Sequence, residues 1–225
     1  MTIFIIVVVC LVIGFVLGIA YKRYRNYQPQ PFQEAQEEFY RLHEERMEMV
    51  EVLSQAEEAL ISLNRMATRD ALTGLTNRRA GEKILSHAHE NALLTRVLYS
   101  VLLVDIDHFK RVNDTHGHEI GDAAIRSVAV VLGNAIRGGD VACRWGGEEF
   151  LCILKGSDIS MAAIIAERIR TAVESVEIPV AGKVTVSIGV ATWRATVTEA
   201  AHIVKAADQG LYEAKQNGRN RVSCG

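Results

Sequence analysis

Residues 141–154 read VACRWGGEEFLCIL. Two apolar runs, 141–145 and 150–154, flank a glycine pair, which supplies the tight turn of a β-hairpin between adjacent strands. Gly146 and Gly147 also let the backbone come close to a ligand, and the carboxylates of Glu148 and Glu149 can bridge a metal ion and a nucleophile. An ordinary solvated hairpin tip is the alternative interpretation of this stretch.

Around this hairpin, residues 70–225 alternate short apolar runs with amphipathic stretches of helical period. The predicted strands are 99–106, 141–145, 150–154, 184–192 and 221–224. The predicted helices are 78–93, 120–136, 161–176 and 198–217. The sequence therefore predicts an α/β fold, in which a sheet containing the hairpin is flanked by helices.

Two polar segments follow predicted elements. The strand over 99–106 runs into Asp105-Ile106-Asp107, and carboxylates at a strand end commonly bind Mg²⁺, although a cap or turn aspartate is the alternative. The last helix ends in KQNGRN at 215–220, where Lys215 and Arg219 flank a glycine. These cations suit a polyphosphate, or they only balance the helix dipole. Together with the hairpin, these segments describe a metal–triphosphate site at the top of a small sheet.

The amino-terminal segment carries no charged side chain over residues 3–20. As a helix it would be about 27 Å long, close to the thickness of a bilayer's hydrocarbon core. The basic cluster YKRYR at 21–25 follows, so the positive-inside rule predicts a retained single-pass anchor with the later residues inside the cell. The alternative is a cleaved signal peptide, in which a basic cluster precedes the apolar run.

A proline pair, Pro29 and Pro31, then interrupts the helical pattern. From Phe32 the spacing becomes heptad-like, with a positions at 32, 39, 46, 53, 60 and 67 and d positions at 35, 42, 49, 56 and 63. Only Arg46 among these is polar, so the seam predicts a parallel, dimeric coiled coil. The alternative is a single amphipathic helix on its own domain, but a helix of roughly 55 Å is longer than a small domain can cover.

These segments divide the chain into an anchor at 1–21, a juxtamembrane linker at 22–31, a stalk at 32–69 and a catalytic domain at 70–225. The formal net charge of −2 argues against a protein that coats nucleic acid. The four cysteines are scattered without a CxxC pair, so the sequence predicts neither a zinc site nor a disulfide framework.

A series of short motifs follows along residues 70–225. They are DALTGLTNRR at 70–79, DIDHFK at 105–110, NDTHGH at 113–118, GD at 121–122, RWGGEEF at 144–150, SIGV at 187–190, AD at 207–208, LY at 211–212, AK at 214–215 and GRN at 218–220. In this order they resemble the GGDEF-domain diguanylate cyclases, bacterial enzymes that join two GTP molecules into cyclic di-GMP. The signature has its GGEEF form. The resemblance implies a palm-like nucleotidyl-cyclase fold with a central sheet rich in antiparallel strands.

By this resemblance, Asp105 and Glu148 would bind a divalent metal ion, Mg²⁺ or Mn²⁺, assisted by the Ile106 carbonyl. Glu149 would be a metal ligand or the general base. These three carboxylates form the implied catalytic set. His118 lies within a matched motif, but the sequence assigns it no role.

The resemblance also implies a substrate-binding set, consisting of Lys110, Asn113, Asp122, Gly146, Gly147, Lys215 and Arg219. Asn113 and Asp122 would read the guanine edge, because a carboxylate accepts from guanine N–H groups but meets an unfavourable lone pair on adenine. The three cations would bind phosphates. The two glycines would let the backbone lie against the nucleotide.

In the implied reaction, each ribose 3′-hydroxyl attacks the α-phosphate of the partner GTP and pyrophosphate leaves. Each domain binds one GTP, so a homodimer is required, and the stalk and inner-membrane anchor would raise the effective concentration of the cytoplasmic domains. Arg137 and Asp140 match the RxxD motif of the family's inhibitory product site. The resemblance therefore implies feedback inhibition by cyclic di-GMP. The net charge, in contrast, is the reason to expect no nucleic-acid partner.

Three other functions fit less well. A non-catalytic receptor for cyclic di-GMP or GTP would usually have a broken signature, whereas Asp105 and residues 146–149 are complete. A cyclase with an adenine-containing product disagrees with Asp122, and a membrane scaffold would not need Glu148. The chain departs from the family at Gly210, where alanine is usual, at a cost of about 1 kcal/mol in helix propensity.

Overall fold

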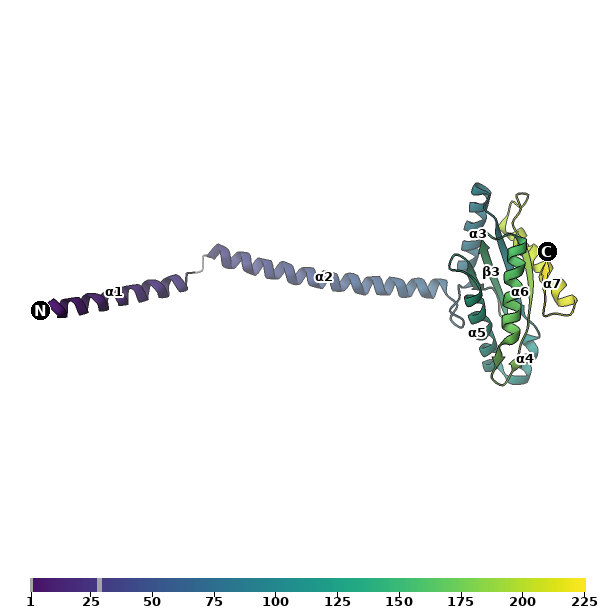
Figure 1. Ribbon diagram of the computed structural model, residues 1–225, viewed down its shortest axis with the longest axis horizontal. Helices are drawn as coiled ribbons and strands as arrows, with labels where there is room; N and C mark the ends of the chain where they lie inside the picture. Colours follow the sequence, from purple (N-terminus) through teal and green to yellow (C-terminus); the bar gives the residue numbers. More distant parts are fainter. Residues whose placement is uncertain (1, 28–29) are drawn as a thin grey trace. The chain divides into compact units, whose positions relative to one another are not determined.

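The computed structural model describes residues 2–27 and 30–225 (Figure 1). The chain divides into two compact units, Met1–Ile61 and Ser62–Gly225. The first unit is helical, and the second contains the sheet.

Helix α1, Thr2–Arg25, lies at the start of the first unit. Its segment Val7–Arg25 has a mean hydropathy of 1.8, and among the described helices it alone is long and apolar enough to cross a membrane. Its last turn carries Lys22, Arg23 and Arg25. The expected apolar helix with a basic end is confirmed, and its insertion into a membrane stays a prediction.

Helix α2, Gln30–Thr68, follows after a break in the helical pattern. The described residues of the break are Asn26 and Tyr27. Of the predicted proline interruption, Pro31 lies in the first turn of α2, and Gln28 and Pro29 lie outside the described residues. The seam side chains Leu42, Leu53 and Leu60 are 54%, 60% and 67% exposed, so α2 presents its apolar seam to solvent. The long helix is confirmed, and its pairing with a second chain stays a prediction.

A five-stranded sheet in the order β2-β3-β1-β6-β7 forms the centre of the second unit. The strands are β1 Tyr99–Ile106, β2 Val141–Arg144, β3 Glu149–Lys155, β6 Val186–Thr192 and β7 Val222–Cys224. Neighbouring strands are antiparallel, except that β6 and β7 are parallel. The antiparallel-rich sheet and the β2–β3 hairpin confirm the expected fold class.

Helices cover both faces of this sheet. They are α3 Arg78–Thr95, α4 Phe109–His116, α5 His118–Ala135, α6 Ile159–Ser175 and α7 Ala200–Gln216. One core joins α5 and α6 to Leu102 and Val104 of β1, and the other joins α3 and α7 to Val101 and Leu103. Because successive strand side chains point to opposite faces, the uninterrupted apolar run of β1 supplies both cores.

Two small features go beyond the sequence prediction. Helix α4 is short and polar, and Phe109 is its one buried side chain, so no apolar period marks it. The strands β4 Glu177–Ile178 and β5 Gly182–Lys183 form a hairpin of two residues each, too short for an alternating pattern. The strand predicted over 184–192 therefore begins two residues later, at Val186, after this hairpin.

Candidate active site

The candidate site is built around the turn between β2 and β3. The Gly146 amide donates to the Glu149 carbonyl at 3.2 Å and helps to close the turn. Arg144, at the end of β2, donates to the Gly147 carbonyl at 2.8 Å and lies 3.3 Å from both carboxylate oxygens of Asp70. The predicted glycine turn is confirmed, and a charged pair beside it fixes its shape.

Gly146 also makes room for an acidic side chain. A Cβ atom at this position would lie 2.6 Å from Glu149 Oε2, which is far inside van der Waals contact. The carboxylate of Glu149 therefore folds over the glycine, and a larger residue at position 146 would push it aside.

Acidic side chains and a lysine meet where β1 ends. Asp105 is opposite Glu149 in the β1–β3 register, and Lys215 Nζ, from the last turn of α7, lies 2.9 Å from Asp105 Oδ1. The Ile106 amide donates to the Glu148 carbonyl at 3.4 Å, which keeps the hairpin tip beside the strand end. The structure thus brings these predicted residues together at one end of the sheet.

Burial and neighbouring charges shift the pKa values of two of these carboxyls. Burial raises the pKa of Asp105, while the ion pair with Lys215 acts in the opposite direction. Burial also raises the pKa of Glu148, and the negative charges of Asp105 and Glu149 add to this effect. The site therefore concentrates more negative charge than its own lysine balances.

These groups fit a divalent cation. Mg²⁺ and Mn²⁺ prefer oxygen ligands, and a bound cation would relieve the repulsion between Asp105 and Glu148. Within the described part of the chain, no three His, Cys, Asp or Glu side chains form a ready metal-binding group. Because Mg²⁺ commonly binds through one or two carboxylates and substrate phosphates, the site suits a metal held jointly by protein and nucleotide.

The second aspartate of the strand end, Asp107, is bonded differently. Its Oδ1 accepts from Ser187 Oγ at 2.6 Å, and its Oδ2 accepts from Thr185 Oγ1 at 2.7 Å and from the Asn220 amide at 3.0 Å. Both oxygens of this buried carboxylate are therefore occupied. The sequence motif does not distinguish the two aspartates, because these donors lie 78 to 113 positions away along the chain.

The residues expected to read guanine lie on two neighbouring helices. Asn113 is on α4, and Asp122 follows Gly121 in α5. Asn113 Oδ1 is buried and has no hydrogen-bond partner among the described residues, and a Cβ at Gly121 would overlap it. Lys110, in the first turn of α4, is exposed. The glycine thus leaves space for the Asn113 amide, whose buried acceptor is unpaired among the described residues.

The RxxD residues lie in the turn between α5 and β2. Arg137 is exposed, with Nε 3.4 Å from Asp140 Oδ2, and it also donates to the Lys155 carbonyl. Asp140 is turned inward, where Oδ1 accepts from the Lys155 amide at 3.0 Å. A cavity of about 560 Å³ beside the turn is lined by Arg137 and by Arg168 of α6. Arg168 belongs to no quoted motif, and only the packing of α6 against α5 brings it here.

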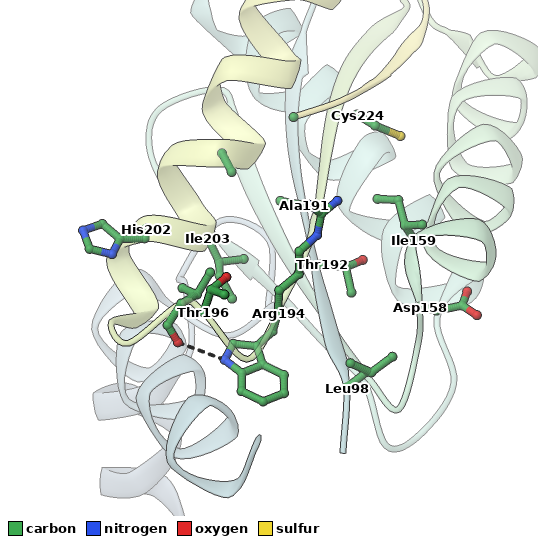
Figure 2. A pocket seen from close by; sticks show the side chains of 14 residues that line it. Leu98, Asp158, Ile159, Ala191, Thr192, Arg194, Thr196, His202, Ile203 and Cys224 are labelled. Atoms are coloured by element: carbon green, nitrogen blue, oxygen red, sulfur yellow. Dashed lines mark hydrogen bonds between the residues drawn. The ribbon is translucent and has the colours of Figure 1, made fainter. Parts of the chain in front are cut away.

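Another cavity, of about 500 Å³, lies at the other end of the sheet (Figure 2). Asp158, before α6, lies on one side of it and His202 of α7 on the other. Thr192, which also lines it, pairs with Ser100, so the cavity lies about 17 Å along β1 from Asp105. The predicted site residues, all within the described chain, do not line it.

Comparison with known proteins identifies the class of domain that this fold and site define. The family model described as "Diguanylate cyclase, GGDEF domain" matches residues 67–221, which is well over half of the chain. The chain belongs to the GGDEF family. Members of this family use divalent metal ions, in agreement with the oxygen-rich centre described above.

Individual relatives agree with this assignment. The chain is 42% identical over 162 residues to the response regulator PleD of Caulobacter vibrioides, covering 70% of this chain and 36% of PleD. It is 47% identical over 127 residues to diguanylate cyclase A of Treponema denticola, covering 55% of this chain and 34% of the relative. The chain thus spans about a third of the length of these relatives.

A solved structure with a similar arrangement is that of the coiled coil and GGDEF domain of DgcB from Caulobacter crescentus in complex with c-di-GMP. It superposes with a TM-score of 0.75 at 34% identity, over 82% of this chain and 99% of that chain. The active GGEEF domain of a diguanylate cyclase from Vibrio cholerae is 32% identical, with a TM-score of 0.65, over 67% of this chain and 97% of that chain. The second of these has the same signature form as residues 146–150.

Proposed function

We propose that this chain is a diguanylate cyclase that condenses two GTP molecules into cyclic di-GMP and releases pyrophosphate. The observation that carries the proposal is the meeting of Asp105, Glu148 and Lys215, in which Lys215 Nζ lies 2.9 Å from Asp105 Oδ1. A nucleoside triphosphate requires carboxylates that hold a divalent metal ion and, beside them, a positively charged side chain that binds its phosphates. The complete signature supports catalysis over binding alone.

Substrate binding is divided between two groups of residues. The buried Asn113 Oδ1, without a partner among the described residues, supports acceptance of a hydrogen bond from guanine, and Asp122 adds a carboxylate acceptor. Lys110, Lys215 and Arg219 bind the phosphates. An adenine ring offers no N1–H to these acceptors, so the pair selects GTP.

The carboxylates at the strand end then carry out the chemistry. Asp105 and Glu148, with the Ile106 carbonyl, would hold Mg²⁺ or Mn²⁺. When bound, the metal supplies positive charge that favours ionisation of the ribose 3′-hydroxyl and neutralises the phosphates. Glu149 accepts the hydroxyl proton, and the cations at the end of α7 stabilise the charge on the leaving pyrophosphate.

Each domain binds one GTP, so two copies must face each other. The exposed apolar seam of α2 supports pairing of stalks, and the related DgcB structure contains a coiled coil beside its GGDEF domain. Helix α1 with its basic last turn supports a single-pass anchor in the bacterial inner membrane, with the domain in the cytoplasm. The domain limits 1–21, 22–31, 32–69 and 70–225 are part of the same proposal.

The activity is tested on the full chain in detergent with GTP and Mg²⁺, with products separated by chromatography. Cyclic di-GMP is expected from the wild type and from Glu90→Ala, which changes an exposed glutamate of α3, but not from Glu148→Ala. If a dimeric sample freed of bound cyclic di-GMP binds GTP and makes no product, the chain is a receptor. A product derived mainly from ATP would instead indicate a cyclase of different specificity.

We also propose that cyclic di-GMP inhibits the enzyme at the cavity beside Arg137. The exposed guanidinium there, with Arg168 on the same cavity, suits the phosphates and guanine edge of the product. Asp140 supports the site by bonding the Lys155 amide, which fixes the turn that presents Arg137. Arg137→Ala should keep its initial rate and lose inhibition by added cyclic di-GMP, and unchanged inhibition would rule this site out.

A further inference from the structure

The loop that follows α7 has a backbone conformation that side-chain-bearing residues rarely adopt. Its φ angles are 108° at Gly218, 62° at Arg219 and 45° at Asn220. Glycine tolerates this region, but the two residues after it do so at a cost in free energy. Such a conformation persists only where surrounding contacts hold it in place.

Asp107, the residue directly after β1, holds this loop. Its Oδ2 accepts the Asn220 amide at 3.0 Å, while Thr185 and Ser187 of the neighbouring chain segment fix the same carboxylate at 2.7 and 2.6 Å. Asp107 is only 5% exposed, so these hydrogen bonds to a charged acceptor are protected from water.

The Asn220 side chain is held from the other direction. Its Oδ1 accepts from Arg170 at 2.7 Å, its Nδ2 donates to Glu174 at 2.8 Å, and these two residues of α6 also pair with each other at 2.9 Å. The loop is therefore fixed at Asn220 both to Asp107, directly after β1, and to α6. Arg219 lies directly before this fixed point, and its own amide donates to the Ala214 carbonyl at 3.0 Å.

We propose that Asp107 is a positioning residue for triphosphate binding. By fixing Asn220, it holds Arg219, and with it the end of α7 that carries Lys215, in the place where phosphates bind. The two aspartates at the end of β1 then have different roles. Asp105 contacts Lys215 directly, whereas Asp107 positions Arg219 through the loop. This inference rests on the proposed function, since it deepens the same site.

Binding of GTP and of guanosine to full-length variants tests the proposal. Asp107→Ala should weaken GTP binding about tenfold, as loss of a charge-assisted hydrogen bond would, and leave guanosine binding unchanged. Asp107→Asn retains an oxygen that can accept the Asn220 amide, so it should restore most of the GTP affinity. Arg219→Ala should add little further loss to Asp107→Ala, because both changes remove the same interaction.

Ser187→Ala serves as a matched control, since it removes a bond to Asp107 Oδ1 without touching the loop contact at Oδ2. It should bind GTP more tightly than Asp107→Ala. An equal fall in GTP and guanosine affinity, or no fall at all, would overturn the proposal.

Amide hydrogen exchange gives a readout that does not depend on nucleotide. Residues 217–221 should exchange faster in Asp107→Ala than in the wild type, and unchanged exchange would also overturn the positioning role. A wild type that binds GTP no better than guanosine would count against the proposed function, while the exchange result would still decide the role of Asp107.

Discussion

Arg144 connects the hairpin of the candidate site to the segment before α3. Its guanidinium bonds the Gly147 carbonyl at 2.8 Å and the Asp70 carboxylate at 3.3 Å, and Asp70 Oδ1 accepts from the amide and hydroxyl of Thr73 at 2.9 and 2.8 Å. Partial burial raises the pKa of Asp70, but the Thr73 hydrogen bonds and the Arg144 charge outweigh it and hold this pKa below its ordinary value. The contact is therefore strongest when Asp70 is ionised.

Asp70→Asn should destabilise the second unit more at neutral pH than in acid. Because the folded-state pKa of Asp70 lies below the value of about 3.9 in an unfolded chain, its stabilisation is present above that value and is lost as the pH falls through the folded-state pKa. Both tryptophans, Trp145 and Trp193, lie in this unit, so their fluorescence can follow urea unfolding. The free-energy difference from the wild type should shrink between about pH 6 and about pH 3. A constant difference would contradict ionisation as the cause.

Residue positions were predictable from the sequence where each residue ends a strongly patterned element. Asp105 closes an apolar strand, Glu148 follows a glycine pair and Lys215 ends an amphipathic helix, and the structure brings the three together. The inward orientation of Asp140 and the loop contact of Asp107 were not predictable. Each depends on a backbone amide that only the folded chain brings near.

At the scale of elements, α7 packs on the sheet through two glycines. A Cβ at Gly189 of β6 would meet the backbone of α7, and a Cβ at Gly210 of α7 would lie 2.8 Å from the Ser223 carbonyl and 3.3 Å from Gly189 Cα. The sequence pattern presents Gly210 only as a weakness in the helix. The structure explains it, because the helix that carries Lys215 approaches β6 and β7 too closely for a side chain.

Gly210→Ala and Gly133→Ala should therefore have opposite effects. Both change a glycine inside a helix to a better helix former, but a Cβ at Gly133 of α5 has nothing within 4 Å. Gly133→Ala should raise the free energy of unfolding by about 0.5–1 kcal/mol, whereas Gly210→Ala should lower it by about 1–3 kcal/mol through overpacking. Urea unfolding followed by tryptophan fluorescence measures both. Equal stabilisation by the two variants would show that α7 can move away from the sheet without cost.

The sequence predicts those elements that carry a clear apolar pattern and misses those that do not. The strand over 99–106 agrees with β1 at both ends, since the apolar run 101–104 at its centre gives a strong strand pattern. Helix α4 and the β4–β5 hairpin are missed, because their positions are set by packing and turn geometry, which leave no periodic pattern. Predicted function depended little on these elements, except that α4 carries Lys110 and Asn113.

At the scale of the whole molecule, the proposed reaction needs two copies of the second unit. One copy binds one GTP, and a stalk that pairs through its seam would keep two copies at high effective concentration. The seam leucines of α2 are more than half exposed, so their burial in a coiled coil would provide the apolar area that drives pairing. Pairing of α2 and catalysis should therefore be lost together.

The double variant Leu53→Glu/Leu60→Glu tests this link by placing charges at two a positions of the seam. Sedimentation in detergent should show a monomer, because paired helices would bury unpaired carboxylates. At low protein concentration the initial rate should be lower than that of the wild type. It should also increase with the square of the protein concentration, as expected when two monomers must meet.

Ser54→Glu/Ser62→Glu is the matched control, since it adds the same charges to the same helix outside the seam. This variant should stay dimeric, with a rate proportional to protein concentration. If the leucine variant remained dimeric, the heptad seam would not be the dimer contact. If it became monomeric while keeping its full rate at every concentration, each domain would complete the reaction alone, and the requirement for two facing copies would be wrong.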